Sequence, residues 1–182
     1  MVHMAGMLGA PPMSQLDLHI EQKIAQRDSI DLAARRLAGR AGWIVEFGLG
    51  RGRSYSHLAA RFPDREIYCF DRERANIPGW GPPADHVLYG DIATVLADPG
   101  VHARFQDRVI LAHLDLAWGP ASDARLHRLV LERTRNWLRP GAWVLSDRAV
   151  ALEPAWRLTP VEVSDEVAFA SRFHRYERRP AA

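Results

Sequence analysis

The sequence predicts an α/β fold: a seven-stranded, mainly parallel, doubly wound sheet with an antiparallel C-terminal strand pair, in a three-layer α/β/α sandwich. Three observations predict it. Short apolar runs alternate with helical or crossover segments along the 182 residues, the pattern of parallel strands joined by right-handed crossovers. Three alternate glycines follow the first apolar run. Two late alternating segments lack a helix between them, which favours an antiparallel pair.

The N-terminal part of the chain is predicted to be helical. Residues 12–39 carry apolar side chains at helical spacing. Ser29 is a residue type that caps helices, and it is expected to begin a second helical segment. Gly39 is a natural C-terminal stop for that segment.

The remaining elements follow from apolar runs and breakers. The five parallel strands are predicted at 43–47, 66–71, 86–90, 108–116 and 142–147. Helices are predicted at 54–62, at 91–98 with Asp91 as cap, and at 124–141. The prolines of segment 72–85 exclude much helix there. The two late strands are predicted within 156–163 and 169–178.

Length and composition bound the class of protein. A chain of 182 residues with 47% apolar and 25% charged residues is expected to form one soluble domain with a full core. No run of 18 or more apolar residues is present, so no membrane span is expected. The start, MVHMAGMLGAPPM, lacks the charged and apolar regions of a signal peptide. Residues 1–12 are therefore predicted to be a disordered leader.

Charge and cysteine content narrow the partners and the compartment. The net charge is only +2, and the arginines are scattered rather than gathered into a stripe with aromatic residues. A nucleic-acid partner is therefore not expected. A single cysteine excludes an internal disulfide and fits a reducing cytoplasm, which is the predicted location. Cys69 lies in an apolar strand, so we expect a buried, inert thiol.

The stretch VEFGLGRGRSY carries the strongest functional signal. A strand that leads into a glycine-rich turn and then a helix binds anions and nucleotides, because a ligand can approach the bare main chain. Gly48, Gly50 and Gly52 would allow that approach, or would only supply the unusual dihedrals of a tight turn. The GxGxxG form would need glycine where Arg53 stands. What is present is E-x-G-x-G-x-G, with Glu46 at the strand end.

Over about residues 40–178 the sequence resembles the class I S-adenosylmethionine-dependent methyltransferases, as a small single-domain member of bacterial type. Their first motif, [DE]-x-G-x-G-x-G, is matched by residues 46–52. Asp71 matches the acid that takes the ribose hydroxyls, and Asp91 matches the acid placed beside the adenine amino group. The sequence HLD at 113–115 and LRPGA at 138–142 match the fourth and fifth motifs.

The resemblance implies the fold already predicted, with residues 41–180 as the cofactor domain. Residues 13–40 are expected to be a helical lid or dimer segment, because they remain to cover the pocket, with the proline-rich loop 76–85 as a second possibility. The resemblance also implies S-adenosyl-L-methionine as cofactor and S-adenosyl-L-homocysteine as product. The implied cofactor-binding residues are Glu46, Phe47, Gly48, Gly50, Gly52, Arg53, Ser54, Tyr55, Asp71, Arg72, Gly90, Asp91, Ile92 and His113. Simpler roles stay open for Asp71 and Asp91, because each could merely cap the segment that follows it.

Methyl transfer needs mainly alignment and exclusion of water, with a base only when the acceptor must lose a proton. His113 and Asp115 are the catalytic candidates, although His113 could equally be a histidine hydrogen-bonded inside its strand. The expected substrate pocket comprises Trp118, Asp147 and Arg148. A salt bridge from Arg148 to Asp115 or Asp147 is the alternative for these charged residues, and simple packing is the alternative for Trp118.

The sequence does not favour a metal or a nucleic-acid base as partner. Metal-dependent relatives hold magnesium with an acid after strand four and an Asp-Asn pair after strand five, but here Arg148 follows Asp147 and arginine is no ligand. The [DNS]-P-P-[FYW] signature of enzymes that methylate base amino groups is replaced by Asp115-Leu116-Ala117-Trp118. We therefore expect no metal and a small-molecule acceptor.

The predicted function is transfer of a methyl group to oxygen or nitrogen of a small-molecule nucleophile, by a protein that forms a homodimer or higher homo-oligomer. Three alternatives stay open. The chain could bind the cofactor without transferase activity, or methylate RNA through its arginine-rich end. An NAD-dependent oxidoreductase is the third, and Arg53 disfavours it.

Overall fold

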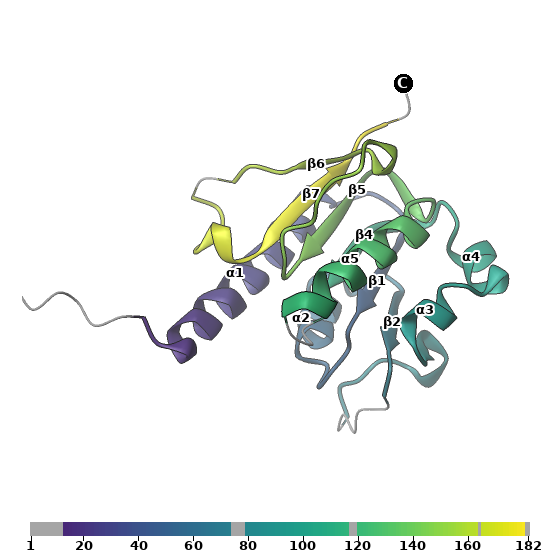
Figure 1. Cartoon of the computed structure of the whole chain (residues 1–182), viewed down its shortest axis with the longest axis horizontal. Coiled ribbons are helices and arrows are strands. Elements are labelled where there is room, and N and C mark those ends of the chain that lie inside the picture. The colour runs from purple at the N-terminus through teal and green to yellow at the C-terminus, as the bar shows by residue number, and fades with distance from the viewer. Residues whose placement is uncertain (1–12, 74–78, 117–119, 164, 181–182) are drawn as a thin grey trace, which may run out of the picture.

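The computed structural model describes residues 13–73, 79–116, 120–163 and 165–180. Its centre is one seven-stranded sheet in the order β3-β2-β1-β4-β5-β7-β6 (Figure 1). The strands are β1 (Trp43–Phe47), β2 (Ile67–Asp71), β3 (Val87–Tyr89), β4 (Val109–Leu114), β5 (Leu138–Ser146), β6 (Leu158–Pro160) and β7 (His174–Arg178). The first five are parallel, and β7 runs antiparallel to both β5 and β6. The predicted mixed sheet is confirmed.

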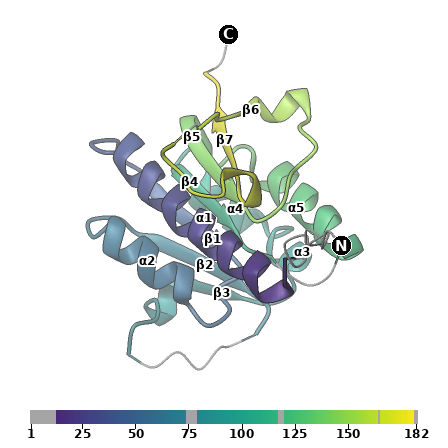
Figure 2. The same ribbon diagram turned by 90° about the vertical axis from the view of Figure 1, so that its left-hand side faces the viewer.

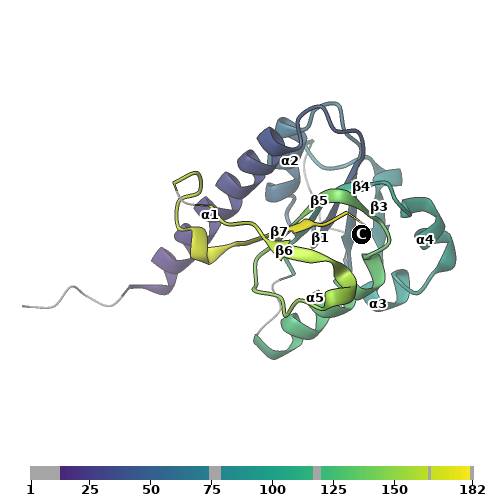
Figure 3. The ribbon, with the colours of Figure 1, turned by 90° about the horizontal axis from the view of Figure 1, so that it is seen from above.

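Helices cover both faces of the sheet and complete the three layers (Figures 2 and 3). One face carries α1 (Gln15–Arg36) and α2 (Arg53–Arg61). The other carries α3 (Ile92–Val95), α4 (Pro99–Phe105) and α5 (Pro120–Thr134). Among the described helices, none is long and apolar enough to span a bilayer.

The N-terminal helix α1 is continuous, and the predicted second segment starting at Ser29 is wrong. Ser14 caps the helix in a reciprocal capping box with Asp17. The Ser29 hydroxyl donates to the carbonyl of Ala25 at 2.6 Å inside the helix. A serine that bonds back to the preceding turn is compatible with a helix interior, so it starts nothing.

Two further differences from the prediction are an additional helix, α4, and an earlier end of helix α5. Helix α4 was not expected, although Asp98 caps it and Pro99 occupies its first turn. The helix predicted at 124–141 ends at Thr134, where the amide of Trp137 closes the turn by donating to the Thr134 carbonyl. The sequence 138–142 is then the start of β5 rather than a turn before it, because Leu138 pairs with Val109 of β4.

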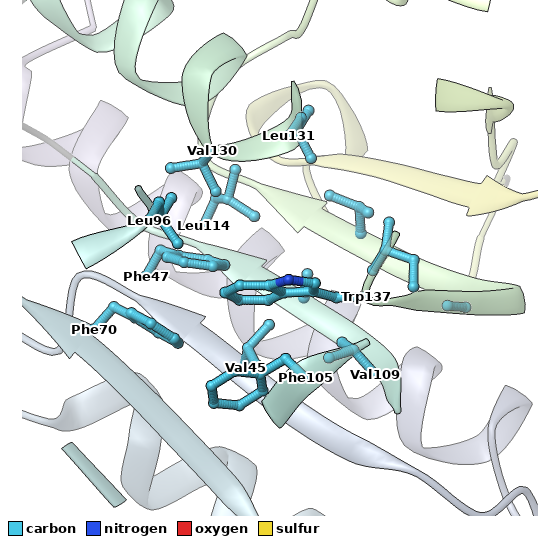
Figure 4. Close-up of a cluster of buried hydrophobic side chains, with 14 of the residues drawn as sticks. Val45, Phe47, Phe70, Leu96, Phe105, Val109, Leu114, Val130, Leu131 and Trp137 are labelled. Atoms are coloured by element: carbon cyan, nitrogen blue, oxygen red, sulfur yellow. The ribbon is translucent and has the colours of Figure 1, made fainter. Parts of the chain in front are cut away.

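An aromatic core fixes the sheet against the helices α4 and α5 (Figure 4). The rings of Phe47 and Phe70 stack with centroids 4.8 Å apart, and those of Phe105 and Trp137 with centroids 4.7 Å apart. All four side chains are fully buried or within 1% of it. Phe47 is the last residue of β1 and Phe70 precedes the last residue of β2, so this packing holds the strand ends at which the site is built.

Candidate active site

The carboxyl ends of the parallel strands β1 and β4 lie side by side at the point where the strand order of the sheet reverses. From β1 the chain proceeds through β2 to β3 on one side, whereas β4 leads to β5 on the other. Ligands of open α/β sheets bind in the crevice that such a reversal leaves. The glycine turn after β1 and the segment after β4 both reach this point.

The glycines of the turn have different neighbours. Gly48 has φ +93°, and a Cβ there would lie 2.1 Å from the carbonyl oxygen of Asp115. Its missing side chain therefore lets two main-chain segments of the protein approach each other. A Cβ on Gly50, at φ +50°, would meet no protein atom within 4 Å. Gly52 adopts φ +69° and is the N-cap residue of α2.

A cavity of about 890 Å³ opens over this turn. Of the predicted site residues, nine line it: Gly48, Gly50, Arg53, Ser54, Asp71, Arg72, Asp91, Ile92 and Asp115. Nine further lining residues were not predicted: His19, Lys23, Gln26, Leu49, Arg51, Phe70, Glu73, Leu116 and Leu126. Three of these come from α1, which carries no motif, so only its prediction as a lid pointed toward them.

Asp71 is held with its carboxylate in the cavity wall. Its Oδ2 accepts from the Gly50 amide at 2.7 Å, and its Oδ1 accepts from the Glu73 amide at 3.1 Å. The acid is therefore fixed in place beside the glycine turn. Asp91 also lines the cavity while its Oδ1 accepts from the Thr94 amide at 3.0 Å. The capping role that the sequence left open for Asp91 is thus present together with its place in the cavity.

Several predicted cofactor residues lie behind the cavity rather than in its wall. Phe47, Tyr55 and Glu46 are buried. The amide of Gly90 donates to the main-chain carbonyl of Asp71 at 3.0 Å and so supports the end of β2. Gly52 does not line the cavity either. Trp118 lies outside the described residues.

His113 belongs to a buried polar row that crosses the sheet. Its Nδ1 lies 3.3 Å from Oε1 of Glu46, and neither side chain has any exposed surface. On the other side of Glu46, the Cys69 thiol donates to Oε2 at 3.7 Å. Burial and the adjacent Glu46 carboxylate raise the pKa of Cys69 far above its usual range, as expected for an inert thiol.

The amide of Gln26 on α1 joins this row to Asp115. Its Nε2 lies 3.0 Å from Nε2 of His113 and donates to Oδ2 of Asp115 at 2.9 Å. His113 is therefore hydrogen-bonded inside its strand and does not line the cavity.

Asp115 is the catalytic candidate that does line the cavity, but its carboxylate is already bound. Lys23 of α1 donates to Oδ2 at 3.0 Å. Burial alone would raise the pKa of Asp115, but the neighbouring His113, the Lys23 cation and the Gln26 hydrogen bond together hold it below its usual range. A carboxylate in this state holds α1 in place and is a weak proton acceptor.

The two predicted pocket residues after β5 lie apart from this cavity. Asp147 Oδ1 is 2.6 Å from Nε2 of the buried His127 on α5. The main chain of Arg148 exchanges hydrogen bonds with the Ser146 hydroxyl, at 2.7 and 3.3 Å. Within the described ranges, no group of three or more His, Cys, Asp or Glu side chains is placed to hold a metal ion.

Together the fold and the site define a Rossmann-like α/β protein in which a glycine turn follows the first strand and a fixed carboxylate ends the second, both at one cavity. A family model described as S-adenosyl-L-methionine methyltransferase matches residues 13–178. The chain therefore belongs to this family: it is an S-adenosyl-L-methionine-dependent methyltransferase, and the resemblance seen in the sequence is confirmed.

Solved structures agree with this assignment. An S-adenosyl-L-methionine methyl transferase from Silicibacter pomeroyi DSS-3 is 31% identical, with 91% of this chain and 98% of that chain covered and a TM-score of 0.80.

Two more distant structures share the fold. CalS11, a TDP-rhamnose 3'-O-methyltransferase of calicheamicin biosynthesis, is 20% identical with 91% and 81% coverage and a TM-score of 0.57. The 1,6-didemethyltoxoflavin-N1-methyltransferase of Burkholderia thailandensis is 16% identical with 88% and 81% coverage and a TM-score of 0.53. No curated protein matches the chain.

Proposed function

We propose that this methyltransferase transfers the methyl group to oxygen or nitrogen of a small molecule, mainly by alignment and exclusion of water. The observation that carries the proposal is the cavity of about 890 Å³, which α1 walls on one side and the strand ends on the other. Small-molecule sites typically enclose roughly 300–1,000 Å³. The cavity therefore suits a nucleoside cofactor together with part of a small acceptor. It suits these ligands better than it suits the surface of a macromolecular substrate.

The residues that line the cavity fit the cofactor. Asp71 would accept from the two ribose hydroxyls, because its fixed carboxylate keeps lone pairs beyond the two amides that it binds. The cofactor would lie against the main chain at Gly50, where a side chain would project into the cavity. Asp91 would lie near the adenine amino group. When bound, S-adenosyl-L-methionine supplies a methyl group on a positively charged sulfur.

Helix α1 would act as the lid. Its side chains His19, Lys23 and Gln26 line the cavity, and Lys23 and Gln26 tie it to Asp115. CalS11 acts on TDP-rhamnose and the Burkholderia enzyme on 1,6-didemethyltoxoflavin, so this fold accommodates small acceptors. A dimer contact through residues 13–40 stays a prediction, and its measure is the mass of the protein in solution.

Calorimetric titration tests the cofactor site. We expect the wild type to bind S-adenosyl-L-homocysteine, and Asp71→Asn to weaken binding at least about tenfold, because one neutral amide replaces a charge that accepts from both hydroxyls. Asp64→Asn is the matched control, because this aspartate is exposed and does not line the cavity. Binding of NAD in place of the nucleoside thioether would contradict the assignment of the site.

Formation of S-adenosyl-L-homocysteine tests the acceptor class. The enzyme is incubated with labelled cofactor and either a protein-free, nucleic-acid-free bacterial extract below about 1 kDa or purified bacterial RNA. We expect turnover with the low-mass extract only. Label in RNA would favour the RNA alternative, and cofactor binding without turnover on either substrate would favour a binding protein.

A further inference from the structure

A second cavity, of about 450 Å³, lies beside the cofactor cavity at the same edge of the sheet. Asp147 and His174 lie at the adjoining ends of β5 and β7. Ser171 and Arg172 of the short helix Ala170–Arg172 form one wall, and His19 and Gln22 of α1 form the other. Figures 1 and 3 show α1 passing beside the turn that leads into β7.

The two cavities adjoin. The amide of Asp147 donates to the carbonyl of Leu114 at 3.0 Å, so the segments after β4 and β5 leave the sheet next to each other. Asp115 after β4 lines the first cavity, and Asp147 after β5 lines the second. His19 lines both. A molecule in the second cavity would therefore be a neighbour of the cofactor.

The charged side chains of the second cavity are already paired. Asp147 binds His127 at 2.6 Å, with both side chains nearly inaccessible. Arg172 binds Glu21 of α1 at 2.8 Å, which also fastens the wall. The imidazole of His174, by contrast, has no hydrogen-bond partner among the residues that the structure describes. The polar side chains left to meet a ligand in this cavity are those of His174, His19, Gln22 and Ser171.

We propose that this second cavity binds the methyl acceptor, a small polar and uncharged molecule with a hydroxyl or N–H at the accepting atom, and that His174 removes that proton. The proposal rests on the proposed function. The acceptor atom forms a bond to the methyl carbon, and the bond from that carbon to sulfur breaks with its electron pair left on sulfur. The proton of the acceptor passes to the His174 imidazole, so the positive charge of the sulfonium ends on the imidazolium.

His174 is better placed for this role than His19. It is half-buried on the sheet, whereas His19 is exposed on α1. The groups around His174 are Asp147, which follows β5, with its partner His127 of α5, Arg172, His19 of α1, and Arg175 on its own strand. Burial and then Arg175 lower the pKa of His174, and Asp147 opposes them only in part. The imidazole is therefore neutral at pH 7 and free to accept a proton.

The experiment uses the full chain, the active low-mass extract fraction as acceptor, and S-adenosyl-L-homocysteine for binding. We expect His174→Gln to lower kcat at least about 100-fold while its affinity for S-adenosyl-L-homocysteine stays within about twofold. The wild-type rate should fall only as the pH drops through the His174 pKa, below the usual histidine range, and the residual rate of the variant should lack this limb. His57→Gln, a partly buried histidine paired with Asp31 outside both cavities, is the matched control.

A second variant tests the cavity independently in case His174→Gln does not fold. Ser171→Phe adds bulk at an exposed position of the cavity wall. We expect it to raise KM for the extract fraction at least about tenfold and to leave S-adenosyl-L-homocysteine affinity unchanged.

Two results would overturn the inference while leaving the proposed function intact: turnover of His174→Gln within about threefold of wild type, or Ser171→Phe with unaltered KM. A 100-fold loss in His19→Gln with none in His174→Gln would also overturn it. Methyl transfer to RNA alone would instead defeat the proposed function itself.

Discussion

At the residue scale, two glycines of the turn after β1 are required for different physical reasons. Gly48 is required by the fold, because a Cβ there would collide with the Asp115 carbonyl. Gly50 has open space beside it and lies in the cavity wall. In the family motif the two positions look alike, so their roles separate only when the neighbouring strand end is in place.

Alanine substitutions at these two glycines should therefore differ in their effects on the free energy of unfolding and on cofactor binding. We expect Gly48→Ala to lower the free energy of unfolding by about 3 kcal/mol or more, since steric overlap adds to the cost of a positive φ. Gly50→Ala should cost about 1–2 kcal/mol for its positive φ alone. It should weaken S-adenosyl-L-homocysteine binding at least about tenfold, because the methyl group enters the cavity. Urea unfolding and calorimetry measure the two effects, and equal losses of stability would contradict this division.

At the scale of elements, α1 is attached to the sheet through polar as well as apolar contacts. Gln26 is nearly inaccessible and bonds His113 and Asp115 simultaneously, while Lys23 accompanies it at Asp115. On the next turn, Ser29 accepts from Arg175 of β7 at 2.9 Å. One helix thereby contacts the ends of β4 and β7, and it walls both cavities.

Gln26→Leu should loosen α1 more than its apolar gain compensates. The leucine would leave Nε2 of His113 without its hydrogen-bond partner, and an unsatisfied buried polar group costs about 1–3 kcal/mol. We expect a loss of that size in the free energy of unfolding and faster hydrogen exchange in α1. Gln106→Leu, at an exposed position after α4, is the control and should change stability by less than about 0.5 kcal/mol. Unchanged exchange in α1 would show that the polar contacts do not hold the helix.

At the scale of the whole molecule, the cofactor cavity lies at the carboxyl-terminal edge of the parallel strands, beside α1. Its walls come from α1, from the turn after β1 and from the ends of β2 and β4, which are far apart in the chain. A ligand that binds all of these binds the folded state only. Its binding free energy is then added to the stability of the entire domain.

Saturation with S-adenosyl-L-homocysteine should therefore raise the melting temperature. At a concentration of 100 times Kd the gain is about 2.7 kcal/mol, which corresponds to roughly 5–10 °C for a domain of this size. Asp71→Asn should show a smaller shift at the same concentration, because its Kd is higher. Calorimetric scanning measures both shifts. An equal shift for wild type and variant would remove Asp71 from the cofactor site.

The elements that sequence predicted well are those with local signals. Apolar runs between glycines and prolines define β1 and β2, and an alternating tail without a helix defines the pair β6 and β7. The boundary near residue 138 was wrong because helical periodicity continued past Thr134. There the pairing of Leu138 with β4 outweighs local propensity.

By itself, the sequence determined the family, the cofactor and the mixed sheet, because a bare turn, strand-end acids and periodicity are encoded within short stretches of chain. Only the tertiary structure decided which of these side chains reach a cavity. It placed His113 in a buried polar row and showed that the Asp115 carboxylate is hydrogen-bonded by α1. It also brought His174, from near the C-terminus, into the same cavity wall as Asp147. Such placements depend on strand order and on packing between distant segments, and no local pattern in a single chain carries that information.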